Sequence, residues 1–111
     1  MQILKIIAAV ATLITGVISL VRPMAVREFT GLEIPGPRGV TEVRAVLGGA
    51  FIGLGAAMLI LNNPSAYATV GIMYLVVAAV RLVSMFIDGS LVSSNWISVG
   101  FELVFGLILV Y

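Results

Sequence analysis

The chain has 111 residues, of which 61% are apolar and only 10% are charged, and its net charge is +1. Soluble domains contain about 45–50% apolar and about 25% charged residues, so this chain could not cover a water-facing surface with polar groups. The composition indicates an integral membrane protein whose first partner is the lipid bilayer, and it excludes a basic surface for nucleic acid. Cysteine and histidine are both absent, which excludes disulfides, the usual zinc sites and histidine-ligated haem within this chain, so we expect no cofactor and no metal.

The first apolar stretch covers residues 3–21 and is long enough to cross a bilayer as a helix. Its only charged residue is Lys5, and Pro23 prevents the helix from continuing. A signal peptide is the competing interpretation, because it also combines a positive start with an apolar run. The run is long for a signal peptide and no clear cleavage site follows it, so we expect the stretch to be retained as the first span.

The longest connection, residues 22–40, follows this span. Within it, residues 25–29 predict a short interfacial helix, and the Pro-Gly-Pro sequence at 35–37 predicts a rigid turn. Half of the basic residues of the chain lie in this connection: Arg22, Arg27 and Arg38. Cytoplasmic loops of membrane proteins are enriched in arginine and lysine, so we expect a multi-pass protein of the cell membrane with this loop in the cytoplasm and both termini outside.

Three more apolar stretches follow, at residues 41–61, 66–87 and 95–111. We expect the Thr41 hydroxyl to cap the first of them. Trp96 and Tyr111 mark the two ends of the last, where amphipathic rings favour the membrane interfaces. Four continuous apolar runs with short connections predict an all-α fold, an antiparallel four-helix bundle that forms a single transmembrane domain over residues 1–111. A β-barrel would instead need alternating strands of about ten residues.

Two ionisable residues lie well inside the last two spans. At 1.5 Å per residue, Arg81 is roughly 9 Å from the end of its span at Ile87, and Glu102 is roughly 10 Å from the start of its span at Asn95. Their helix faces are otherwise small or aromatic: Gly71, Tyr74 and Ala78 beside Arg81, and Ser98 and Gly106 beside Glu102. Because charges inside a membrane need partners, we expect Arg81 and Glu102 to pair at matched depth. A structural pair that fixes helix register is favoured over a transport or ligand site.

Glu42 and Arg44 lie near the start of the second span. They are two residues apart, and therefore about 200° apart around a helix, so only one can face the bundle centre. We expect Glu42 to point inward and to join the buried polar cluster of Arg81 and Glu102. Arg44 could extend to lipid head groups.

The second span also carries two sets of small residues for helix packing. Ala45, Gly49, Gly53 and Ala57 recur at four-residue spacing, and Gly48 and Gly55 lie on another face. Small residues at such spacing let a neighbouring helix approach closely. One bundle is not expected to need both faces. With Glu42 inward, we expect the first set to pack within the chain and the Gly48–Gly55 face to contact another chain.

The stretch Pro37-Arg-Gly-Val-Thr-Glu-Val-Arg-Ala-Val-Leu-Gly-Gly49 resembles the signature of a family of small bacterial four-span membrane proteins of unknown function, the DoxX-like group. Residues 81–88, 94–95 and 102–106 are similar to the same pattern, so the resemblance covers nearly the whole chain. It implies a four-helix membrane bundle and supplies no established activity. It singles out Arg38, Glu42, Arg44, Arg81, Asp88, Asn95 and Glu102, which adds Arg44, Asp88 and Asn95 to the predicted polar cluster.

Three classes of function remain open. The first is a non-enzymatic membrane protein that acts through helix association, as a homo-oligomer or an accessory subunit of a larger membrane complex. The second is a small transporter or ligand-binding bundle, with Arg81, Glu102 and Glu42 around a polar site open to the cytoplasm. The third is an enzyme or a quinone-binding redox subunit, which, without histidine or cysteine, would need a cofactor held by polar contacts alone or supplied by a partner. We favour the first and do not expect an enzyme.

Overall fold

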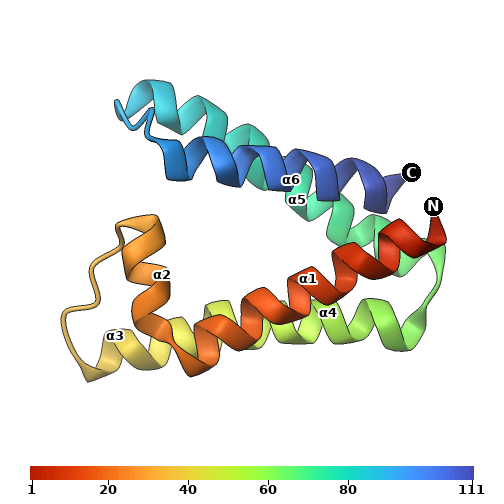
Figure 1. Cartoon of the computed structure of the whole chain (residues 1–111), viewed down its shortest axis with the longest axis horizontal. Coiled ribbons are helices and arrows are strands. Elements are labelled where there is room, and N and C mark those ends of the chain that lie inside the picture. Colours follow the sequence, from red (N-terminus) through yellow and green to blue (C-terminus); the bar gives the residue numbers. More distant parts are fainter. The chain divides into compact units, whose positions relative to one another are not determined.

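In the computed structural model, all 111 residues are described, and they form helices without strands (Figure 1). Four helical segments are long and apolar enough to cross a membrane: Gln2–Val21, Pro37–Leu61, Pro64–Ile87 and Ser93–Val110. The predicted all-α class and the four long apolar helices are therefore confirmed. This is the length and composition of a multi-pass membrane protein, and it is compatible with a helical membrane bundle.

The second apolar segment begins earlier than expected. Its first part is α3, Pro37–Glu42, followed by a π-helical stretch, η1, Val43–Gly48, and by α4, Gly49–Leu61. Proline suits the first turn of a helix, where its missing N–H would have no partner, so the segment starts at Pro37. Thr41 therefore lies inside the helix, and its hydroxyl donates to the carbonyl oxygen of Pro37 (3.2 Å) instead of capping.

The long connection contains a short helix, α2, Pro23–Thr30, which is somewhat longer than the predicted interfacial helix. Gly31 ends it with a φ of 79°, a left-handed conformation that glycine adopts without steric cost. The backbone N–H of Gly31 donates to the carbonyl of Arg27 (2.8 Å), which closes the last turn.

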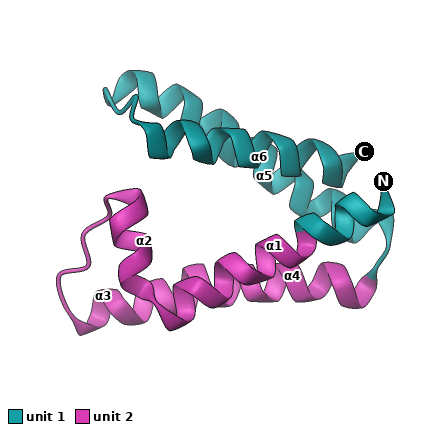
Figure 2. Ribbon diagram, in the orientation of Figure 1, with its two compact units in different colours: residues 1–8, 62–111 teal, residues 9–61 magenta.

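The chain divides into two compact units (Figure 2). One consists of residues 9–61, here called the α1–α4 unit, and includes most of α1, Gln2–Val21. The other consists of residues 1–8 and 62–111, here called the α5–α6 unit, with α5, Pro64–Ile87, and α6, Ser93–Val110.

In the α1–α4 unit, the two long helices cross antiparallel at glycines. A Cβ on Gly55 would lie 2.8 Å from the backbone nitrogen of Leu13, and one on Gly48 would lie 3.2 Å from the carbonyl oxygen of Gly16 and from Leu20 Cβ. A Cβ on Gly16 would lie 2.7 Å from the carbonyl oxygen of Gly48 and also too close to the backbone nitrogen of Ile52. The expectation that Gly48 and Gly55 face another chain is therefore wrong, because α1 of the same chain already occupies that face.

The other small residues of α4 and the turn before it are on an open surface. Ala45, Gly49 and Gly53 are exposed, and Ala57 is half-buried. No atom lies within 4 Å of where a Cβ would stand on Gly49 or Gly53. The face that was expected to pack within the chain is therefore open, and the face that was expected to be free for another chain is packed against α1.

In the α5–α6 unit, the two helices pack antiparallel along most of their length. A Cβ on Gly71 would lie 2.9 Å from the backbone nitrogen of Val110, and one on Gly106 would lie 3.2 Å from the carbonyl oxygen of Gly71. Close backbone approach at these two glycines brings the neighbouring side chains into contact. Tyr74 and Phe105 meet edge to face, with ring centroids 5.9 Å apart.

Candidate functional site

The polar centre of the α5–α6 unit is an ion pair between its two helices. Arg81 of α5 donates from Nε to both carboxylate oxygens of Glu102 (2.9 and 3.2 Å), and from Nη2 to Glu102 Oε2 (2.9 Å). Both residues stand where the depth estimate placed them, on facing sides of one helical hairpin. The contact is the fork-to-fork arrangement that makes arginine–carboxylate pairs strong and specific in geometry.

Asn95 joins this pair to the turn between the helices. Its Oδ1 accepts from Arg81 Nη1 (3.1 Å), and its Nδ2 donates to the carbonyl oxygen of Ser90 (2.9 Å). The backbone N–H of Ser90 in turn donates to the carbonyl of Met85 at the end of α5 (2.9 Å). The network therefore fixes the register of α5 against α6 and also the path of their connection.

The network is only partly shielded. The Glu102 side chain is 12% exposed, whereas that of Arg81 is 32% exposed. No buried side-chain nitrogen or oxygen in the structure lacks a hydrogen-bond partner. The Glu102 side chain is thus mostly buried, and both of its carboxylate oxygens accept from Arg81, while part of the guanidinium remains accessible.

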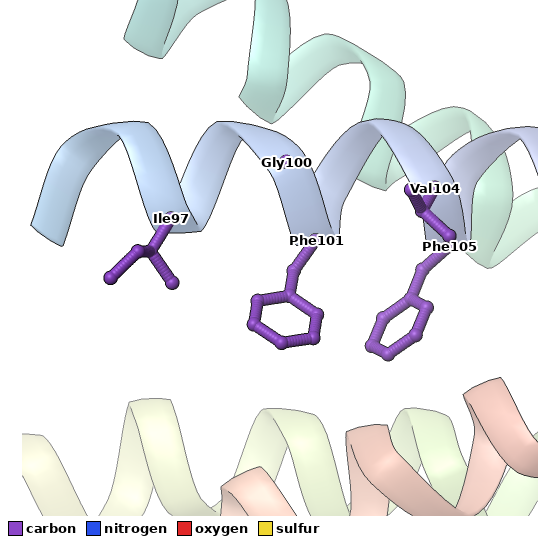
Figure 3. A pocket seen from close by; sticks show the side chains of 5 residues that line it. All are labelled: Ile97, Gly100, Phe101, Val104 and Phe105. Carbon is purple, nitrogen blue, oxygen red and sulfur yellow. The ribbon is translucent and has the colours of Figure 1, made fainter. Parts of the chain in front are cut away.

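The accessible side of Arg81 borders a shallow apolar groove on α5. Its other walls are Val76, Val77 and Val80, which lie between Arg81 and the middle of the helix. A second shallow groove lies on α6, where Ile97, Phe101 and Phe105 project from the same side of the helix (Figure 3). The second groove is lined by apolar residues and has no charged group, so only the first combines an apolar surface with hydrogen-bond donors.

The other residues of the predicted polar cluster are placed differently. Glu42 accepts from Arg38, one turn earlier on its own helix (2.5 Å), and its side chain is 54% exposed. Arg44 is exposed and makes no ion pair. Asp88 is exposed at the end of α5, where its backbone N–H donates to the carbonyl of Ser84 (2.7 Å). Arg81, Glu102 and Asn95 are therefore brought together by side-chain bonds, and Glu42, Arg44 and Asp88 are not.

A second polar group, absent from the sequence-based predictions, lies at the other end of the α5–α6 unit. Asn62 Oδ1 accepts from Gln2 Nε2 (2.8 Å) and from the hydroxyl of Tyr67 (2.7 Å), and Lys5 Nζ lies 5.8 Å from the centroid of the Tyr67 ring. Asn62 has a φ of 45°, and Asn63 caps α5 by accepting from the N–H of Ala66. The asparagine pair before a proline signals a turn, but only the fold shows that Gln2 reaches it.

The long helices and the paired charges between two of them define a class of small helical membrane protein. The comparison with protein families places the chain within that class more narrowly. It belongs to the family described as a domain of unknown function (DUF4345), whose profile matches residues 1–111. The comparisons with curated proteins and with solved structures found no match.

Proposed function

We propose that this protein is a non-enzymatic integral membrane protein that acts through helix association, as a homo-oligomer or as an accessory subunit of a larger membrane complex. The observation that supports this most directly is the contrast between the two glycine faces of the second apolar segment. Gly48 and Gly55 are packed against α1, whereas Gly49 and Gly53 have open space where a Cβ would stand. Close helix packing in membranes uses small residues of this kind.

The state of the ion pair favours association over transport. In a transport site, the ion or substrate must displace the existing partner of a charged residue when it binds, and that partner must return when the ion or substrate leaves. Arg81 engages both oxygens of Glu102, and Asn95 adds a further bond. Breaking such a pair by removing one partner costs about 3–5 kcal/mol, because it leaves an uncompensated charge. A small transporter or ligand-binding bundle therefore remains the second candidate.

The variant Gly53→Leu tests the association proposal. A leucine there projects a large side chain from the open face, because no atom lies within 4 Å of where its Cβ would stand. We expect it to lower the mass of the assembly measured by native mass spectrometry in mild detergent, with helical content and melting temperature unchanged. Ala79→Leu is the matched control, since Ala79 is also a small exposed residue but lies on another helix, α5.

Two other results of this experiment would contradict the proposal. A wild-type protein that is monomeric and purifies without any partner would remove the basis for association. A Gly53→Leu protein that stays at the wild-type mass but melts at a lower temperature would show that the open face packs within its own chain.

We also propose that the protein resides in a bacterial inner membrane and is related to the DoxX-like group. The support for the relationship is the sequence resemblance from Pro37 to Gly49 and at residues 81–88 and 102–106. The support for the orientation is the set of three arginines in residues 22–40, which favours a cytoplasmic loop and external termini. A reporter that is active only in the cytoplasm, fused after Tyr111, should be inactive. Activity there would reverse the orientation.

A further inference from the structure

Arg81 has hydrogen-bond donors that its own unit does not use. A guanidinium carries five N–H groups. Three of them are engaged: the Nε–H and one Nη2–H by Glu102, and one Nη1–H by Asn95. One N–H on each terminal nitrogen is left, and the side chain is 32% exposed. Hydrocarbon offers no acceptor for these groups, and an unmatched donor in that surrounding costs several kcal/mol.

The surface next to these donors is apolar and extends from Arg81 toward the middle of α5 only. Val80, Val77 and Val76 continue the groove from Arg81 toward the middle of α5. In the opposite direction lies Asn95, which accepts from the guanidinium and donates to the carbonyl oxygen of Ser90 in the turn that follows α5. The groove therefore has a donor-bearing end nearer the membrane interface and an apolar end nearer the bilayer centre.

We propose that this groove binds one phospholipid, with the phosphodiester accepting the free N–H groups of Arg81 and an acyl chain lying along Val76, Val77 and Val80. A phosphodiester presents two unesterified oxygens, which match the paired donors of a guanidinium. The orientation of a lipid in the bilayer also agrees with the groove, because the lipid head group would lie toward the end of α5 and the acyl chain toward the middle of the helix. The proposal rests on the membrane location of the helices and is independent of helix association.

The position of Arg81 along α5 allows this contact. At 1.5 Å per residue, the 24 residues of α5 extend about 36 Å, which is longer than a hydrocarbon core of about 30 Å. Arg81 lies about 9 Å from the last residue of the helix, and arginine side chains reach from such depths to the head-group level. A bound phosphate satisfies the remaining donors while the ion pair with Glu102 stays intact.

The test compares two lipids with the same acyl chains. The purified wild-type protein is incubated in mild detergent with phosphatidylglycerol or with diacylglycerol, and the retained lipid is counted by native mass spectrometry. We expect one retained phosphatidylglycerol per chain and no retained diacylglycerol. Equal retention of the two would show that the phosphate plays no part, and no retention of phosphatidylglycerol would overturn the proposal.

Two tryptophan variants locate the site. Val80→Trp fills the groove and should lower phosphatidylglycerol retention at least about tenfold, equivalent to about 1.4 kcal/mol. Val104→Trp is the control: Val104 of α6 is also exposed, 53% against 60% for Val80, but it lines the second groove, which has no charged group. Both positions face outward, so folding should be unaffected, which circular dichroism checks. Equal retention by the two variants would mean that the lipid binds elsewhere, and would contradict the proposal.

Discussion

Two identical substitutions in the second apolar segment should have opposite consequences. Gly55→Ala places a methyl group against α1, whereas Gly49→Ala places one where no atom lies within 4 Å. Both changes replace glycine by alanine in a helix, and both therefore gain the same helix propensity, about 1 kcal/mol. The difference between the two variants isolates the cost of forcing the helices apart.

The size of this cost follows from the contact distances. The new Cβ of Gly55→Ala would lie 2.8 Å from the backbone nitrogen and 2.9 Å from the Cα of Leu13, and ordinary contacts begin at 3.4 Å. The helices must then separate by about 0.6 Å, because backbone atoms cannot rotate away as a side chain would. A gap of 0.5–1 Å loses about a quarter to a half of each dispersion contact along the interface. Overpacking of this kind costs about 1–3 kcal/mol, and the backbone contact places Gly55→Ala toward the upper end.

Reversible unfolding in mixed micelles, followed by circular dichroism as the denaturing detergent is increased, measures both variants. We expect Gly55→Ala to be less stable than Gly49→Ala by about 2–3 kcal/mol. A second pair in the α5–α6 unit, Gly71→Ala against Gly100→Ala, should show the same contrast, since a Cβ on Gly71 would lie 2.9 Å from the backbone nitrogen of Val110 and a Cβ on Gly100 would have no atom within 4 Å. Equal stabilities of Gly55→Ala and Gly49→Ala would refute the packing of α1 on the Gly48–Gly55 face.

The polar contacts of the α5–α6 unit give three more predictions. Glu102→Gln and Arg81→Gln should each lower the free energy of unfolding by about 3 kcal/mol, which is the lower end of the range for a broken ion pair because Arg81 is partly exposed. The double variant should lose clearly less than the sum of the two single losses. Additive losses in a double-mutant cycle would show that the two residues are uncoupled. Asn95→Ala should cost about 1–3 kcal/mol in the same unfolding assay, because it removes bonds to both Arg81 and Ser90; an unchanged stability would mean that Asn95 does not fix the turn. Asn63→Ala should cost about 1 kcal/mol through loss of the cap on α5, whereas Asn63→Ser should restore most of it.

The elements of this fold are predictable from the sequence because its strongest signals are local. Apolar runs of membrane length are long enough to identify each helix, and the depth of a charge in its span follows from residue counting. Arg81 and Glu102 can therefore be paired from the residue pattern alone, since two spans joined by a short turn must run antiparallel. The start of the second segment at Pro37 is not evident in the same way, because Pro35-Gly36-Pro37 is equally typical of a rigid turn.

The assignment of the glycine faces does not follow from local signals. Both faces of the second segment are small, so the choice between them depends on where Glu42 points. The structure pairs Glu42 with Arg38 along one helix, at the exposed surface, which removes the reason for turning it inward. An i, i+4 pair of this kind is visible in the sequence and is the signal that favours the exposed placement. The π-helical turn at Val43–Gly48 changes the angular spacing near these residues, and no sequence pattern indicates it.

Photo-crosslinking in intact membranes tests most directly whether the open face of α4 contacts another protein. A small photoreactive residue at position 53 lies on the face where Gly53 now leaves open space, and one at position 79 lies on an exposed surface of another helix, α5. Helix association through this face predicts that illumination links position 53 to a second polypeptide, so that the product is heavier than one chain, and that position 79 gives little of this product. Adducts confined to a single chain at position 53, or equal yields at both positions, would contradict the proposal that this face binds another chain.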